Sequence, residues 1–424
     1  MAATARSQPA TSGPPTPLAR LTCRAPSSPL SPGMSRAPCA ARSRKPGNLS
    51  RMNSAPARPC PDWFARPQLG IFIHWGIFTI PAWAPRGRMI HTLTGDDFDM
   101  SAVLTPYSEW YENALRVEGS ATRARHREIY GDKPFTAFRP EFDAAAAAFD
   151  ANQWADFFAE AGASYVVFVT KHHDGYCLWP TNVPNPHRRG WNTSRDFVGE
   201  LGEAVRARGM RYGLYYSGGL DWTFRDTPIA NIGDMFACVP TEDDYRAYAF
   251  AQSKELIDRY KPSVFWNDIC WPNGEDVPRL LRLYYSVVPD GVTNDRWLAN
   301  ESFFNSLRDP ASRASFNAML KARSGEPQQE TPAPYADYRC VEFGLGVIPA
   351  EMKWEACRGL GLGFGYNQAE LPEDYLTPDE LIALYRDVTS QRGNLLINVG
   401  PMADGSIPEI QSAPLRALGK TLRA

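Results

Sequence analysis

The chain has 424 residues, a net charge of −2, and enough aromatic residues (12 Trp, 18 Tyr and 21 Phe) to fill a large core. This near-neutral charge gives no argument for a nucleic acid or an acidic membrane surface as a partner, and no apolar run approaches the ~20 residues that span a bilayer. The eight cysteines form no C-x-x-C pair, so neither a disulfide framework nor a structural zinc site is expected.

The chain begins with a stretch rich in Pro, Ser, Ala and Arg. Residues 1–61 hold nine Lys and Arg and no Asp or Glu, which leaves 36 basic against 47 acidic residues in the remainder. Such a composition buries too little apolar surface to pack, so we expect residues 1–60 to be a disordered extension and residues 61–424 to be the folded domain. The extension lacks the apolar core of a secretory signal, which leaves the localisation unknown and the cytoplasm as the default expectation.

Beyond the extension, apolar runs and helical patterns alternate. The first strand is expected at 69–76 and an aromatic helix at 107–112, and an Ala-rich helix at 142–162 should stop at Gly162. Further strands are expected from Ser164 into the polar cluster at 171–174, and at 212–217, 264–268, 291–297, 338–342, 362–367 and 394–400, with helices at 196–208, 242–260, 276–287 and 377–391. Residues 298–336 are polar and irregular, and they indicate no element.

Strand, helix and strand in this rhythm predict a parallel sheet. Seven or eight such units with polar residues at the strand ends favour a closed, irregular (β/α)8-like barrel of the TIM type over an open sheet. The alternative, a doubly wound sheet, would normally carry a Gly-rich phosphate loop after its first strand, and this sequence has none there.

Polar side chains gather where the apolar runs end. The run Val264–Trp266 ends on Asn267 and Asp268, and a carboxylate at the end of a buried strand lies at the mouth of a barrel, where chemistry takes place. The alternative for Asp268 is an ordinary cap of the next helix. The whole strand-end set is His74, Lys171, His172, His173, Asp174, Asp268, Arg296 and Glu342, with Glu109 near the first strand in sequence.

Carboxylates, imidazoles and aromatic rings together suit a sugar, whose hydroxyls need polar partners and whose apolar face packs on a ring. Phosphate chemistry would want more Arg and Lys and a nest of glycines. A metal is the other alternative, with His172, His173 and Asp174 as ligands and His74 completing the site. Against a metal, neighbouring residues of a strand point to opposite faces, so His172 and His173 should not meet one ion.

Several motifs together resemble the α-L-fucosidases of glycoside hydrolase family 29, in order from about residue 63 to 420. They are G-I-F-I-H-W-G at 70–76, Y-S-E-W-Y at 107–111, T-K-H-H-D-G-Y at 170–176, F-W-N-D at 265–268, N-D-R-W at 294–297, K-W-E-A-C-R-G at 353–359, F-G-Y-N at 364–367 and N-L-L-I-N-V-G-P-x-x-D-G at 394–405. The resemblance implies an irregular (β/α)-barrel and a retaining exo-glycosidase that hydrolyses α-L-fucosyl linkages without a metal or an organic cofactor.

The resemblance also implies roles for residues at matching positions. Asp268 matches the nucleophile, and Glu342 fits best as the acid/base, with Glu355 as the alternative. The residues that match contacts of the sugar are His74, Tyr107, Glu109, His172, His173, Trp266, Arg296 and Phe364. The implied partner is a fucosylated oligosaccharide or glycoconjugate, with no nucleic acid or membrane, and an oligomer is left open.

Two departures and one further class accompany the resemblance. The segment from Arg296 to Tyr338 is longer than expected, and the chain reaches Ala424 soon after N-V-G-P, where family members continue into a β-sandwich. We therefore expect the C-terminal β-sandwich to be missing. A non-catalytic barrel that binds fucose is the alternative function, although a pure binder has no need for the carboxylate of Asp268. A metal-dependent barrel hydrolase is the second alternative function.

Overall fold

Eight parallel strands form a nearly closed barrel in the computed structural model, which describes residues 58–87, 95–323, 333–344 and 351–424. The strands are β1 (Leu69–Ile73), β2 (Tyr165–Lys171), β3 (Arg211–Tyr216), β4 (Val264–Asn267), β5 (Val292–Thr293), β6 (Tyr338–Glu342), β7 (Lys353–Gly359) and β8 (Asn394–Val399). Their order is β5-β4-β3-β2-β1-β8-β7-β6, with Ile71 of β1 opposite both Val166 and Ile397. This confirms the expected (β/α)8-like barrel.

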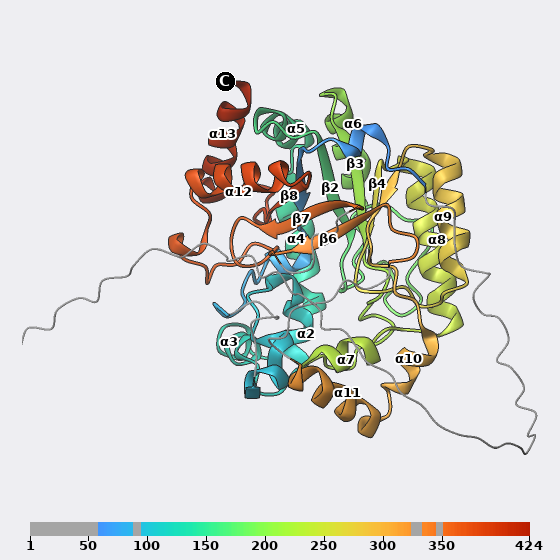
Figure 1. Ribbon diagram of the computed structural model, residues 1–424. Coiled ribbons are helices and arrows are strands. Elements are labelled where there is room, and N and C mark those ends of the chain that lie inside the picture. Colours follow the sequence, from blue (N-terminus) through green and yellow to red (C-terminus); the bar gives the residue numbers. More distant parts are fainter. Residues whose placement is uncertain (1–57, 88–94, 324–332, 345–350) are drawn as a thin grey trace, which may run out of the picture. The chain divides into compact units, whose positions relative to one another are not determined.

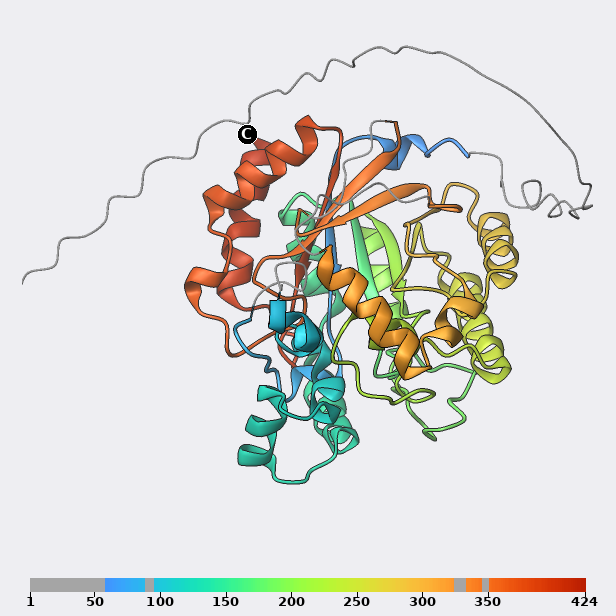
Figure 2. The same cartoon turned by 60° about the horizontal axis from the view of Figure 1, so that its bottom comes forward.

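Helices alternate with the strands and cover the outside of the barrel (Figure 1). They are α1 (Asp62–Ala65), α2 (Tyr111–Arg116), α3 (Ala121–Tyr130), α4 (Arg139–Ala145), α5 (Ala151–Glu160), α6 (Phe197–Ala207), α7 (Ile232–Ala237), α8 (Asp243–Tyr260), α9 (Asp276–Val287), α10 (Glu301–Ser306), α11 (Pro310–Ala322), α12 (Pro378–Ser390) and α13 (Glu409–Arg423). Helices α2, α3, α7, α10 and α11 gather at the lower end in Figure 1, and the view in Figure 2 brings this end forward. Short 3-10 turns lie at Ile77–Thr79, Gly95–Val103, Ser108–Trp110, Phe135–Phe138, Ala146–Ala148 and Pro372–Asp374.

The strands separate two apolar layers. Every residue of β1 is buried, because Ile71 and Ile73 point toward the helices while Phe72 points into the barrel. This explains why the strand is an unbroken apolar run and not an alternating one. Gly70 also faces the interior, where a Cβ would overlap the ring of Tyr165, so only glycine fits at this position.

The helix expected at 142–162 is two helices. The first, α4, ends at Ala145, and after a 3-10 turn the chain is extended at Phe149 and Asp150 before α5 begins. Asp150 caps α5, since its Oδ1 accepts from the backbone amides of Asn152 (2.8 Å) and Gln153 (3.1 Å). An acidic N-cap inside an apolar pattern was the signal for this break.

The last third of the barrel differs most from expectation. The strand expected at 362–367 is a loop, and the strand at this point of the sheet is β7 at Lys353–Gly359. Buried and half-buried residues are mixed along β7, and its sequence contains no apolar run from which the strand could be predicted. The strand expected at 291–297 is only Val292–Thr293, and residues 298–336, for which no element was expected, contain α10 and α11.

The extension expected at residues 1–60 falls almost entirely on residues 1–57, which lie outside the described residues. Packing begins before Asp62, because the guanidinium of Arg58 donates to the carbonyl of Gly291 (2.8 Å) and lies 4.3 Å from the ring of Tyr285. Within the described part of the chain, no helix combines the length and apolarity that a membrane span requires.

Candidate active site

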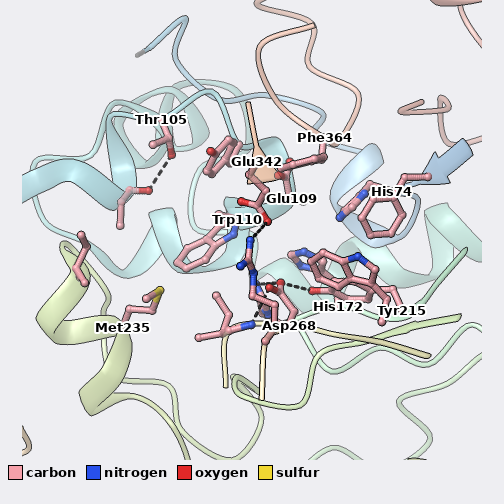
Figure 3. Close-up of a pocket in the computed structure, with 18 of the residues that line it drawn as sticks. His74, Thr105, Glu109, Trp110, His172, Tyr215, Met235, Asp268, Glu342 and Phe364 are labelled. Carbon is pink, nitrogen blue, oxygen red and sulfur yellow. Dashed lines mark hydrogen bonds and ion pairs between the residues drawn. The ribbon is translucent and has the colours of Figure 1, made fainter. Parts of the chain in front are cut away.

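A cavity of about 320 Å³ opens where the strands end. All ten residues to which the resemblance assigns a role line it, whereas Lys171 and Asp174 of the strand-end set do not. The ten residues are His74, Tyr107, Glu109, His172, His173, Trp266, Asp268, Arg296, Glu342 and Phe364. They come from segments almost 300 residues apart in sequence, and parallel strands bring them together because their carboxyl ends meet at one edge. Figure 3 shows His74, His172 and Phe364 on one side of Asp268 and Glu342.

Asp268 directly follows β4 and is fixed by backbone contacts. Asn294 extends the short β5 with its side chain, which accepts from the amide of Asn267 (3.1 Å) and donates to the carbonyl of the same residue (2.8 Å). The amide of Ile269 donates to Oδ1 of Asp268 (2.7 Å), and Ile269 has a φ of +63°. A β-branched residue rarely adopts this conformation, which costs about 1–3 kcal/mol and is typical of functional sites.

The other carboxylate oxygen of Asp268 faces the pocket. Oδ2 accepts from the hydroxyl of Tyr215 at 2.7 Å, and Nε2 of His173 lies 3.6 Å away. Burial and the negative charge of Glu342 raise the pKa of Asp268 to about 6, while the bond from Tyr215 and the charge of Arg296 oppose this rise. Asp268 therefore titrates closer to neutral pH than an ordinary aspartate does.

Glu342 ends β6 and meets Arg296 across the mouth of the barrel. Nη2 of Arg296 donates to Oε1 of Glu342 at 3.1 Å, and Nη1 lies 3.2 Å from Oδ1 of Asp295. Phe343, which follows Glu342, has a φ of +48°, so a residue in the left-handed region follows each of the two pocket carboxylates that end a strand. In both places the chain turns away sharply and leaves the carboxylate at the edge of the cavity.

His74 presents a lone pair to the cavity. Nδ2 of Asn398 donates to the carbonyl of Phe364 (2.5 Å), so Oδ1 of Asn398 is the acceptor for Nδ1 of His74 (2.6 Å). Nδ1 then carries the proton and Nε2 is an acceptor. Burial lowers the pKa of His74 to about 3, so the ring is neutral at any pH at which the enzyme would act.

His172 and His173 line the same cavity, with ring centres 4.1 Å apart, which contradicts the expectation that they point to opposite faces. The reason is that β2 ends at Lys171, so strand alternation no longer holds for the two histidines. Ser217 donates to the carbonyl of Leu220 (2.6 Å) and so accepts from Nδ1 of His173 (2.6 Å), which leaves Nε2 as an acceptor. Burial holds the pKa of both histidines well below its usual value.

A third carboxyl and several aromatic rings also line the cavity. Oε2 of Glu109 accepts from the amide of Gly365 (2.9 Å), and burial raises the pKa of Glu109 to about 7. The ring of Phe364 lies 5.0 Å from that of His74 and 6.1 Å from that of Tyr107. The indole of Trp266 stacks on the ring of Tyr215, with ring centres 5.4 Å apart, and lines the cavity.

Glu355, the alternative acid/base, does not line this cavity. It is fully buried inside the barrel, where Oε2 accepts from the hydroxyl of Tyr165 (2.5 Å), and burial raises its pKa to about 7. Within the described residues, no three His, Cys, Asp or Glu side chains are grouped as metal ligands would be, so the metal-dependent alternative has no candidate ligand set there.

Several contacts that shape the site were not expected. Tyr215 bonds to Asp268, while Asn398 and Ser217 fix the tautomers of His74 and His173. Asn398 had a visible signal, because it is a polar residue inside an apolar strand. Helix α7 gave none, since it has only six residues in a stretch without periodicity.

The comparisons with known proteins agree with this geometry. The family model described as Alpha-L-fucosidase matches residues 38–424. The human tissue α-L-fucosidase is 31% identical over 385 residues, which cover 87% of this chain and 69% of that protein. The α-fucosidase of Thermotoga maritima, solved in complex with a mechanism-based inhibitor, is 39% identical with a TM-score of 0.69, and the match covers 86% of this chain and 74% of that one. The same enzyme in complex with fucose is 38% identical with a TM-score of 0.68, at the same coverage. With its barrel and its strand-end carboxylates, this chain is therefore an enzyme of the α-L-fucosidase family, glycoside hydrolase family 29.

Proposed function

We propose that this α-L-fucosidase releases fucose with retention of configuration, with Asp268 as the nucleophile and Glu342 as the acid/base. The observation that carries the proposal is that both carboxylates line one pocket around Arg296. This arginine bonds to Glu342 and is close enough to Asp268 for its charge to lower the pKa of that carboxyl. Retaining glycosidases use two carboxylates on opposite sides of the scissile bond.

In the first step, Oδ2 of Asp268 attacks C1 of the fucosyl group while the bond from C1 to the leaving oxygen breaks. The protonated carboxyl of Glu342 gives its proton to that oxygen, and the aglycone departs as an alcohol. Glu342, now ionised, then takes a proton from water, whose oxygen attacks C1 and releases Asp268. Two inversions leave the configuration at C1 unchanged.

The polar lining suits the hydroxyls of the sugar. Nε2 of His74 and Nε2 of His173 are acceptors, so hydroxyls would donate to them. Nε2 of His173 and Oδ2 of Asp268 are acceptors 3.6 Å apart, so a sugar hydroxyl that approaches this pair from the cavity would donate its one proton to one of them. His172 has a buried Nδ1 that lacks a partner among the described residues, which is a further point for a ligand.

The apolar part of the sugar also has a complement. The ring of Phe364, packed on His74 and Tyr107, suits the methyl group of fucose, and Trp266 lines the same cavity. The natural partner is then a fucosylated oligosaccharide or glycoconjugate. A barrel that only binds fucose would not require the carboxylate of Asp268, with its pKa of about 6, to face the pocket.

The test is to assay Asp268→Ala and Glu342→Ala with an activated aryl α-L-fucoside in the presence of azide. Each variant should lose several orders of magnitude in kcat without azide. With Asp268→Ala, azide replaces the nucleophile and should give the β-fucosyl azide. With Glu342→Ala, azide replaces the water of the second step and should give the α-fucosyl azide.

Glu355→Gln is the matched control, since this carboxyl is buried outside the pocket, and it should form no fucosyl azide. If Asp268→Ala kept a tenth of the activity, Asp268 would be a structural cap. If Glu355→Gln and not Glu342→Ala gave the α-azide, the role of acid/base would belong to Glu355.

A further inference from the structure

The cavity continues beyond the two carboxylates, away from the histidines. Figure 3 shows Met235 and Thr105 on the opposite side of Asp268 and Glu342 from His74, His172 and Phe364. A retaining glycosidase holds the sugar on one side of its carboxylates and the leaving group on the other. If the sugar occupies the histidine side, as proposed above, this second side receives the leaving group.

The wall of this second side is apolar. Helix α7 contributes Ile232, Met235 and Phe236, all of them partly exposed, and Ala102 and Ile269 complete the wall. Four of these five side chains are partly exposed at this end of the cavity, where an apolar group of a ligand would cover them.

The two polar side chains of this wall, Asn231 and Thr105, already form hydrogen bonds within the protein. Oδ1 of Asn231 caps α7 by accepting from the amide of Asp234 (3.0 Å), and it also accepts from Nδ2 of Asn317 (2.9 Å). The side-chain nitrogen Nδ2 of Asn231 donates to the carbonyl of Asp99 (3.4 Å). The hydroxyl of Thr105 donates to the carbonyl of Ala102 (3.2 Å). The hydroxyl of Thr105 therefore has no proton left for a second sugar, and Nδ2 of Asn231 keeps only one of its two N–H donors, so these two side chains offer few donors to sugar hydroxyls.

The wall is also held rigidly from behind. The side chain of Asn317 in α11 accepts from the amide of Gly233 at 3.0 Å, and a Cβ at Gly233 would overlap that side chain. Arg313 of α11 pairs with Asp234 at 2.9 Å, and the ring of Phe236 lies 5.4 Å from that of Phe303 in α10. The long segment after Arg296 thus supports α7, so the apolar wall exists before a ligand binds.

We propose that the apolar wall of α7 selects fucosides whose leaving group is a hydrophobic alkyl or aryl alcohol over those whose leaving group is a second, hydroxyl-rich sugar. The inference rests on the proposed function, since it assigns the sugar to the histidine side. Met235 is the most adaptable member of the wall, because an unbranched thioether can adjust to leaving groups of different shape.

The test uses ethyl, butyl and hexyl α-L-fucosides, whose leaving alcohols have nearly equal acidity and differ in apolar length. Each methylene buried against the wall should raise kcat/KM about fourfold until the wall is filled. The kcat/KM of the hexyl fucoside should also exceed that of a fucosyl-galactose disaccharide. Met235→Ser should flatten this dependence on chain length and Met235→Leu should restore it, while Met319→Ser, at an exposed methionine of α11 that does not line the cavity, should leave it unchanged.

Dissociation constants of the same series, measured by calorimetry on Asp268→Ala, report on the wall without turnover. The same trend with chain length in binding supports the inference even if the catalytic assignment fails. The inference is overturned if neither kcat/KM nor the dissociation constant changes with the length of the alkyl chain. It is also overturned if kcat/KM for the disaccharide is more than tenfold higher than for the hexyl fucoside. Formation of the two fucosyl azides together with a flat series would keep the proposed function and reject the apolar preference.

Discussion

Burial and hydrogen bonds together set the ionisation of the residue proposed to attack the sugar. The pKa of Asp268 is raised to about 6 because the carboxyl lies in a poorly hydrated pocket near Glu342. A protonated carboxyl cannot attack C1, so kcat/KM should fall as the pH falls below about 6. The hydroxyl of Tyr215 stabilises the charged form of Asp268 and so keeps this limb from moving to higher pH.

Tyr215→Phe removes that hydrogen bond and should raise the pKa of Asp268 further. The acid limb of kcat/KM should then move to higher pH by about one to two units, since a bond to a charged group stabilises by about 1.5–3 kcal/mol. The measurement is the pH profile of kcat/KM with an aryl α-L-fucoside. Tyr216→Phe is the control, because the hydroxyl of Tyr216 bonds to Gln252 (3.0 Å) and its ring is equally buried. An acid limb that stays in place, or moves equally in both variants, would show that Tyr215 does not set this pKa.

At the residue scale, the sequence predicts which side chains meet at the strand ends. It does not predict the hydrogen bonds that fix their protonation. His74, Asp268 and Glu342 could be placed together because parallel strands present their last residues at one edge. Which nitrogen of His74 carries the proton depends on Asn398, 324 residues away in sequence, and on the bond from Asn398 to Phe364. A tautomer depends on such contacts and not on the local sequence.

At the scale of elements, a buried ion pair fixes the end of β2 directly before the two histidines. Nζ of Lys171 lies 2.7 Å from Oδ2 of Asp221, and both side chains are fully buried. Oδ1 of Asp221 accepts from the amide of Thr223 (3.0 Å), and the amide of Trp222 donates to the carbonyl of His173 (2.7 Å). The pair therefore joins the end of β2 to the loop that follows β3.

Asp221→Asn leaves the charge of Lys171 buried without its partner and should lower the free energy of unfolding by about 3–5 kcal/mol. Because His172 and His173 follow Lys171 directly, kcat/KM for an aryl fucoside should fall as well. Thermal or urea unfolding together with the assay measures both effects. Asp258→Asn, which breaks the exposed pair of Lys254 and Asp258 on α8, should cost less than about 1 kcal/mol. Equal effects of the two variants would mean that the buried pair has no special role.

Elements with a clear apolar stripe were predictable, and those without one were not. Helix α9 has the expected bounds, 276–287, because four buried residues lie at helical spacing on one face. Helix α11 has no buried residue, so its sequence carries no such pattern. It depends instead on polar contacts such as Asn317 to Gly233 and Arg313 to Asp234, which join it to α7.

At the scale of the whole molecule, the barrel is weakest between β5 and β6, which form no ladder among the described residues. Asp337 bridges this seam in place of a ladder. Its amide donates to the carbonyl of Thr293 (3.0 Å), and its Oδ2 accepts from the amide of Thr293 (2.8 Å) and the hydroxyl of Tyr285 (2.8 Å). The closed barrel was predictable from the number of strands. This seam was not, because β5 has only two residues.

Arg58 stabilises the same seam, which allows a test of where the folded domain begins. Its guanidinium bonds to the carbonyls of Pro289 and Gly291, lies 4.0 Å from Oδ1 of Asp337, and packs on the ring of Tyr285. A chain that starts at Arg58 should therefore keep the thermal stability and activity of the full chain, because the Pro-rich composition of residues 1–57 predicts no packing.

The same truncated chain with Arg58→Ala should be less stable by about 1 kcal/mol or more. The substitution removes charge-assisted hydrogen bonds and a cation–π contact at the seam between β5 and β6, where the described residues form no ladder. Arg66→Ala is the control, because Arg66 follows α1 and is exposed, and its side chain bonds to none of the described residues. Thermal unfolding of the four proteins measures the differences. Loss of stability on removing residues 1–57 alone would place part of the extension in the folded domain. If Arg58→Ala were as harmless as Arg66→Ala, the seam would be closed by Asp337 without help from Arg58.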